Sequence, residues 1–115
     1  MTHPVVHFEV SGKDLEKLQR FYGDLFGWKT QKVPGDVPYA MVEKEDGGIG
    51  GGIGQSRDGS GHVTFYVGTD DPQAILDKAE QLGGKTVMPL MELPQITIAM
   101  FADPEGHVVG LAKGM

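Results

Sequence analysis

The first strand of this chain is predicted by a strict alternation of apolar and polar residues. Val6, Phe8 and Val10 share one face, whereas His7 and Glu9 lie on the opposite face. Such alternation is typical of a β-strand that has one face in a hydrophobic core. We therefore expect the apolar face to pack under a helix and the polar face to meet water or a cavity.

A helix is predicted next, because apolar residues recur at spacings of three and four positions. These residues are Leu15, Leu18, Tyr22, Leu25 and Phe26. Ser11 is a candidate N-cap, and Gly27 stands where a left-handed residue commonly ends a helix. Three short strands are expected to follow, at residues 28–33, 39–45 and 48–54.

The same order of patterns then begins again. The apolar face of the next strand consists of Val63, Phe65 and Val67, which we also expect to pack under a helix, and its polar face consists of His62, Thr64 and Tyr66. Asp71 and Pro72 are a cap followed by a proline at the first helical position, which predicts a second helix. The remaining strands are expected at residues 86–91, 96–101 and 108–112.

The two halves are an internal repeat, and each reads as a strand, a helix and three strands. His7 and His62 open matching strands 55 residues apart, and Gly52 and Gly110 lie 58 residues apart in the last strands. A half of this size cannot bury both faces of its own sheet. The repeat therefore predicts that the two halves pair as one domain or exchange between two chains.

The fold class predicted from this repeat is α+β. Two βαβββ modules are expected to form a curved, barrel-like mixed sheet with the helices on its outside. The single domain spans residues 1–115, with a first module at about 4–54, a linker at 55–61 and a second module at about 62–113.

Composition and charge remove several classes of function. The 115 residues carry a formal net charge of −6 and lack cysteine, which excludes disulfides and thiolate metal ligands. Lys and Arg are not clustered, so we expect no nucleic-acid partner. No apolar run approaches the roughly 20 residues of a membrane span, and the N-terminus lacks the pattern of a signal peptide. We therefore predict a cytoplasmic protein with no membrane partner.

Polar faces of the two opening strands supply the candidate site. If the two half-sheets curl toward each other, polar side chains from both strands converge in a concave pocket between the modules. The converging residues are His7, Glu9, His62, Thr64 and Tyr66. Tyr39 is expected to add an aromatic wall that suits a planar or cationic ligand.

Three segments carry a family resemblance. They are the residues FYGDLFGW at 21–28, Gly61-His62 at the start of the second module, and FADPEG at 101–106. Together with the paired modules, they resemble the vicinal-oxygen-chelate superfamily, which includes glyoxalases, bleomycin-resistance proteins and extradiol dioxygenases. The resemblance covers essentially the whole chain, and it implies a homodimer because short members often build their pockets between chains.

The resemblance also implies where a metal would bind. In metal-dependent members the ligands lie on the first and last strands of each module. The first-strand histidines correspond to His7 and His62, and the last-strand carboxylates fall on Gly52 and Gly110. Because glycine offers no side chain to a metal, we expect these two positions to leave room for a ligand instead.

Two functions follow from this half-complete ligand set. The first is a protein that binds a small organic molecule between its modules, without a complete metal site. Its pocket residues would be Thr64, Tyr66, Gly52, Gly110 and Tyr39. The alternative is a metal-dependent lyase, isomerase or dioxygenase in which His7 and His62 hold a divalent metal ion. Glu9 would then act as the third ligand or as the catalytic base.

Overall fold

The protein is described by a computed structural model that covers residues 2–56 and 58–114. Its elements are β1 (Val5–Gly12), α1 (Leu15–Phe26), β2 (Thr30–Lys32), β3 (Tyr39–Val42), β4 (Gly51–Gln55), β5 (His62–Gly68), α2 (Pro72–Gln81), β6 (Lys85–Glu92), β7 (Thr97–Ala102) and β8 (Val108–Lys113). This order confirms the predicted α+β class with two βαβββ modules. Position 57 of the predicted linker lies outside the described residues. No helix in the described ranges is long and apolar enough to cross a membrane.

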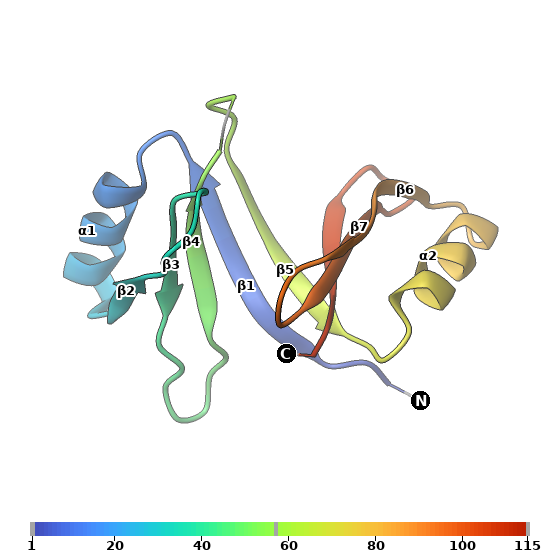
Figure 1. The fold of residues 1–115 in the computed structure, drawn as a ribbon, viewed down its shortest axis with the longest axis horizontal. Helices are drawn as coiled ribbons and strands as arrows, with labels where there is room; N and C mark the ends of the chain where they lie inside the picture. Colours follow the sequence, from blue (N-terminus) through green and yellow to red (C-terminus); the bar gives the residue numbers. More distant parts are fainter. Residues whose placement is uncertain (1, 57, 115) are drawn as a thin grey trace. The chain divides into compact units, whose positions relative to one another are not determined.

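The chain forms two compact units, which we call the N-terminal unit (His7–Val63) and the C-terminal unit (Met1–Val6 with Thr64–Met115). The strand order is β2-β3-β4-β1 in the N-terminal unit and β5-β8-β7-β6 in the C-terminal unit. In each unit the first strand pairs in parallel with the last, and the other neighbours are antiparallel. Figure 1 shows one helix beside each set of strands. The extent of the single domain and of its linker stays a prediction.

The core of the N-terminal unit lies where α1 packs on β3 and β4. It consists of Leu15, Ala40, Val42 and Ile53, with the partly buried Phe8, Leu18, Tyr22 and Trp28 packed against it. α1 begins after Asp14, whose carboxylate accepts a hydrogen bond from the backbone N–H of Lys17, and it ends at the left-handed Gly27 as predicted. The predicted cap Ser11 is wrong, because β1 continues to Gly12 and keeps Ser11 in the strand.

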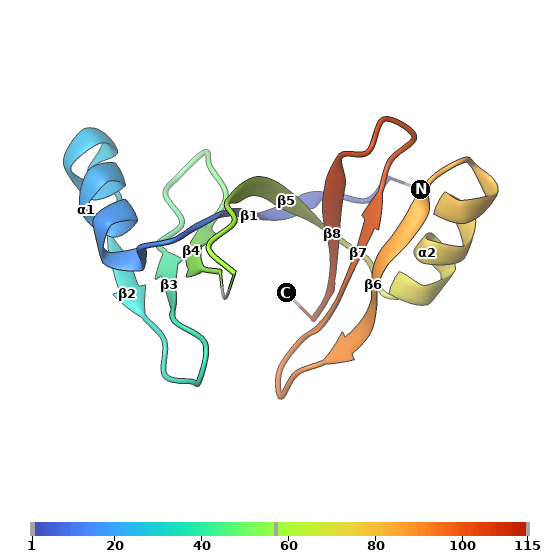
Figure 2. The same ribbon diagram turned by 90° about the horizontal axis from the view of Figure 1, so that it is seen from above.

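A separate core holds the C-terminal unit together. It consists of Leu76, Ala99 and Leu111, with Val67, Ile75 and Phe101 packed against it. α2 begins with Asp71 and Pro72 as predicted, and Figure 2 shows this helix alongside β6. The prediction that Val63 and Phe65 pack under α2 is wrong, since both are exposed, Val63 by 76%. β5 pairs with β8 over Tyr66–Gly68, and both exposed residues precede this paired segment.

Strand register defines how the two repeats correspond. In the first module Gly52 is the register partner of Glu9, and in the second module Gly110 is the register partner of Tyr66. Glu9 and Tyr66 therefore occupy equivalent positions, although they lie 57 residues apart rather than 55.

This register corrects the predicted pairing of the two histidines. The structural counterpart of His7 is Thr64, and His62 stands two positions earlier, at the start of β5. The helix caps Asp14 and Asp71 are also 57 positions apart, which agrees with the corrected alignment. A shift of two residues leaves every side chain on the same face of its strand. Alternation of apolar and polar residues therefore could not detect the error.

Candidate functional site

Four polar side chains of the N-terminal unit join into one hydrogen-bonded chain, which we call the polar network. His7 and Glu9 belong to β1, whereas Tyr39 and His62 stand at the first positions of β3 and β5. His7 Nε2 lies 2.9 Å from the Tyr39 hydroxyl oxygen, and this hydroxyl donates to Glu9 Oε1 over 3.1 Å. The second carboxylate oxygen, Oε2 of Glu9, lies 2.8 Å from His62 Nε2.

The polar network runs from a buried end to an exposed end. His7 is 5% exposed, whereas the side chains of Glu9 and His62 are 14% and 46% exposed. Burial lowers the pKa of His7 below its usual value of 6.5, and the nearby Glu9 carboxylate acts in the opposite direction. The His7 imidazole is therefore neutral at pH 7, and a ligand from solvent would first meet His62 and Glu9.

Neutral His7 allows one consistent direction of hydrogen bonding. Tyr39 has a single hydroxyl hydrogen, which it donates to Glu9. The N–H at Nε2 of His7 then donates to the Tyr39 oxygen. This direction gives the Tyr39 hydroxyl one donor and one acceptor, and it leaves both Glu9 oxygens as acceptors.

Tyr39 covers the glycines of β4. A Cβ atom placed on Gly52 would lie 1.8 Å from the Tyr39 hydroxyl oxygen, and one placed on Gly54 would lie 3.2 Å from the ring carbon Cδ1. The register explains this position, because β3 and β4 place Tyr39 opposite Gly54, two residues beyond Gly52. The expectation that Gly52 leaves room for a ligand is therefore corrected, since the Tyr39 ring fills that space.

The predicted pocket residues of the C-terminal unit are buried in contacts of their own. Thr64 is buried, and its hydroxyl donates to the backbone carbonyl of Val108 over 2.7 Å. The buried ring of Tyr66 covers Gly110, where an added Cβ would lie 2.4 Å from the ring carbon Cδ2. Gly110 therefore opens no free space either. Whether Thr64, Tyr66 and Gly110 line a ligand pocket stays a prediction.

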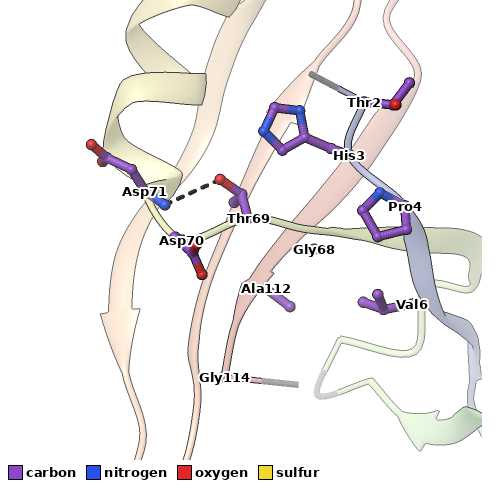
Figure 3. A pocket seen from close by; sticks show the side chains of 10 residues that line it. All are labelled: Thr2, His3, Pro4, Val6, Gly68, Thr69, Asp70, Asp71, Ala112 and Gly114. Atoms are coloured by element: carbon purple, nitrogen blue, oxygen red, sulfur yellow. Dashed lines mark hydrogen bonds between the residues drawn. The ribbon is translucent and has the colours of Figure 1, made fainter.

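A cleft of about 450 Å³ opens in the C-terminal unit, where the residues before β1 meet the ends of β5 and β8 (Figure 3). Its wall includes His3 and Thr69, and the Thr69 hydroxyl accepts a hydrogen bond from the backbone N–H of Asp71 at the start of α2. Neither Thr64 nor Tyr66 lines this cleft. No pattern in the sequence indicated it, because its wall comes from chain ends and turns.

The polar network does not fit a three-ligand metal site. The Nε2 atoms of His7 and His62 are engaged with Tyr39 and Glu9. Within residues 2–56 and 58–114, no group of three or more His, Cys, Asp or Glu side chains has the arrangement to hold a metal ion. Zinc and related metals normally use three or four protein ligands in enzymes. The polar network as arranged therefore does not supply the ligand set of such a site.

The sequence did not reveal the hydrogen bonds of Tyr39. It predicted an aromatic wall, whereas the structure places the hydroxyl between His7 and Glu9. A signal was present in the glycines at positions 52 and 54. Two glycines on one face of a strand leave a strip where a ring from a neighbouring strand can lie.

The family is shown by comparison with known proteins. Residues 7–112 match the family model described as a glyoxalase-like domain. The chain therefore belongs to the glyoxalase-like family, a member of the vicinal-oxygen-chelate superfamily as the resemblance implied. This finding fixes the class of protein and leaves its ligand and reaction undefined.

Particular relatives come from fungi and bacteria. The chain is 29% identical to a glyoxylase-like domain-containing protein of Didymella fabae, with 90% of this chain and 91% of the relative covered. It is 27% identical to the anthracycline biosynthesis protein DnrV of Streptomyces peucetius, with 86% of this chain covered. The chain spans only 42% of DnrV. Methylmalonyl-CoA epimerase from Mycobacterium tuberculosis shares the fold, with a TM-score of 0.73, 12% identity, and 96% of this chain and 87% of that chain covered.

Proposed function

We propose that this protein binds a small organic molecule at the polar network of its N-terminal unit and that binding requires no metal ion. The observation that carries the proposal is the convergence of four polar side chains on one line of hydrogen bonds. The exposed end offers a ligand the carboxylate of Glu9 and the imidazole of His62. A few convergent polar groups of this kind fix the orientation of a ligand in many binding sites.

The relatives support an organic ligand. The name of DnrV refers to the biosynthesis of anthracyclines, and the structural neighbour is an epimerase of methylmalonyl-CoA. These compounds differ from each other, but each carries oxygen atoms that accept or donate hydrogen bonds. We extend only this general class, a small oxygen-bearing organic molecule, to the present chain.

The proposal can be tested by NMR with named probes. Hydroxyacetone, pyruvate, lactate and phenol would be titrated into ¹⁵N-labelled protein that had been treated with EDTA. We expect at least one probe to shift the backbone amides of Glu9, Tyr39 and His62. The substitution Glu9→Gln removes the carboxylate but keeps the shape of the side chain, and it should weaken this binding about tenfold or more.

A matched control is available in the C-terminal unit. His107 Nδ1 lies 2.9 Å from the Asp103 carboxylate, which repeats the His62–Glu9 pairing away from the polar network. His62→Gln should weaken binding, whereas His107→Gln should leave it unchanged. Shifts confined to the cleft of Figure 3 would contradict the proposal, as would equal effects of the two substitutions.

The alternative function is a metal-dependent lyase, isomerase or dioxygenase that uses His7 and His62 with Glu9. It is favoured by one observation, which is that all three residues belong to the same hydrogen-bonded line. The hydrogen bonds within this line would first have to break. Thermal unfolding with Zn²⁺, Ni²⁺ and Mn²⁺ separates the two functions. A rise in Tm that is lost in His7→Ala and His62→Ala would establish the alternative.

We also propose that the protein forms a homodimer. The family resemblance implies this state, and the chain exposes large apolar side chains at Val63, Leu82 and Phe26. Light scattering should then give about twice the 12.4 kDa of one chain. Val63→Lys should shift the mass toward the monomer. A monomer at high concentration would rule out the dimer without affecting the ligand proposal.

A further inference from the structure

The proposed site already holds a phenol that belongs to the chain itself. The Tyr39 ring lies over the strip of β4 that Gly52 and Gly54 leave without side chains. A Cβ on Gly52 would approach the hydroxyl oxygen to 1.8 Å and the ring carbon Cζ to 2.1 Å. Any side chain at this position would therefore collide with the ring. We call this strip, formed by Gly52 and Gly54, the glycine floor, and one aromatic ring covers it.

The polar partners of this ring match its hydroxyl group. A hydroxyl that donates one hydrogen bond and accepts another needs one acceptor and one donor at its oxygen. Glu9 Oε1 is the acceptor at 3.1 Å, and His7 Nε2 is the donor at 2.9 Å. The imidazole of His7 also lies nearly parallel to the ring, with an interplanar angle of 20° and centroids 6.5 Å apart.

Tyr39 is attached at a place where it can leave this floor. It is the first residue of β3 and follows residues 33–38, all of which are exposed. The Tyr39 residue itself is only partly buried. A rotation of its side chain would uncover Gly52 and Gly54 and free the hydrogen-bonding atoms of Glu9 and His7.

We propose that the ligand of this site is a hydroxylated aromatic molecule and that Tyr39 is an internal placeholder for it. This inference rests on the proposed function and narrows it to one chemical class. The ligand ring lies on the glycine floor after Tyr39 rotates away, and its hydroxyl group takes the two hydrogen bonds that Tyr39 makes in the free protein. Tyr39 thus competes with the ligand and lowers its apparent affinity, because only the open fraction of the protein binds.

The decisive experiment removes the placeholder and offers the same group as a free molecule. The side chain of tyrosine corresponds to p-cresol, so p-cresol should fill the space left in Tyr39→Ala. We expect calorimetry to show at least tenfold tighter binding of p-cresol to Tyr39→Ala than to the natural protein. Toluene has the ring without the hydroxyl, and it should bind Tyr39→Ala about tenfold more weakly than p-cresol does.

Three further variants exclude an unfolded protein or unspecific binding as the cause of the result. Tyr39→Phe keeps the fold and the ring but loses the hydrogen bonds that hold it, so p-cresol should bind it several-fold tighter than the natural protein. In Tyr39→Ala combined with Glu9→Leu, the acceptor of the hydroxyl hydrogen is lost, so the preference for p-cresol over toluene should become smaller. Tyr22→Ala is the matched control, because Tyr22 packs in the aromatic cluster with Phe26 and Trp28. A cavity there should show no preference for the hydroxyl.

Three outcomes would overturn the inference. They are p-cresol binding to a folded Tyr39→Ala no tighter than to the natural protein, equal binding of toluene and p-cresol, and unchanged binding in Tyr39→Phe. These failures differ from a failure of the proposed function. If hydroxyacetone or lactate bound at Glu9 and His62 while p-cresol did not respond to Tyr39, the site would stand and its ligand class would be wrong.

Discussion

The two units of this protein share one architecture but place different chemistry at equivalent positions. Register aligns four pairs of residues, which are His7 with Thr64, Glu9 with Tyr66, Tyr39 with Ile98, and Gly54 with Ala112. The N-terminal unit has a histidine, a glutamate and a tyrosine at the first three of these positions, and they belong to one polar network. The C-terminal unit has a threonine, a tyrosine and an isoleucine there.

One device is common to both units. In each, a tyrosine ring lies over a glycine of the last strand, Tyr39 over Gly52 and Tyr66 over Gly110. The rings come from different strands, β3 in one unit and β5 in the other. The space above the glycine of the last strand is therefore filled by a tyrosine ring in both units, although the ring comes from a different strand in each. The polar network formed where the ring arrived beside a histidine and a glutamate.

The largest expected effect tests whether the two glycine–tyrosine pairs are equally rigid. Gly110→Ala brings a Cβ within 2.8 Å of Cγ of Tyr66, the ring atom nearest the backbone. Because rotation cannot move that atom far, we expect a loss of about 3 kcal/mol in the free energy of unfolding. Urea denaturation measures this loss.

Gly52→Ala is the matched change in the other unit. It meets the far end of Tyr39, namely the hydroxyl, Cζ and Cε2. Rotation of the side chain relieves this contact, so we expect a loss of only about 1 kcal/mol. The loss caused by Gly52→Ala should be smaller still when it is measured against Tyr39→Ala, because the ring that it meets is then absent. Equal losses for Gly110→Ala and Gly52→Ala would break the comparison.

The pH dependence of stability separates the units next. His7 is neutral and buried in the N-terminal unit, and its equivalent Thr64 does not titrate. The pKa of His7 in the folded protein is lower than its ordinary value of 6.5. Its neutral form therefore contributes fully to the free energy of unfolding above pH 6.5, and this contribution is lost as the pH falls toward the folded pKa.

The unfolded chain binds the proton first in this window, so stability should decrease on acidification from pH 7. The slope attributable to one proton is at most about 1.4 kcal/mol per pH unit. Thermal unfolding between pH 7 and pH 5 should show a flatter profile for His7→Gln than for the natural protein. Identical profiles would mean that burial of His7 does not control its protonation.

A smaller effect is expected from Thr64→Val. This change keeps the size of the side chain but removes the hydrogen bond to the Val108 carbonyl. We expect a loss of about 1 kcal/mol in the free energy of unfolding. The shifts that probes cause at Glu9 and His62 should be unchanged, because Thr64 acts within the C-terminal unit. Altered probe binding in Thr64→Val would show that this residue contributes to the ligand site.

The smallest effect is expected from His62→Gln. Its side chain is 46% exposed, so solvent screens the pairing with Glu9. The expected loss of stability is about 0.5 kcal/mol or less. A large loss in the same denaturation assay would indicate a structural role for His62 rather than the proposed binding role.

Local sequence patterns determined most of the secondary structure. The caps Asp71 and Pro72, and the left-handed Gly27 at the end of α1, are local features of the backbone that adjacent residues specify. Alternation also placed His7 and Glu9 together on one face of β1, because side chains of a strand alternate with a period of two. The family resemblance rested on the paired modules and three short segments, and the match over residues 7–112 confirmed it.

Tertiary structure decided the register and therefore the site. A two-residue shift between the repeats preserves the alternation of apolar and polar residues. The sequence therefore made His62 the equivalent of His7, whereas the register of the strands makes Thr64 its equivalent. The space above Gly52 could not be assigned from the sequence for a related reason. Which ring fills a gap depends on the strand that pairs beside it, and the β3–β4 register placed Tyr39 there, between His7 and Glu9.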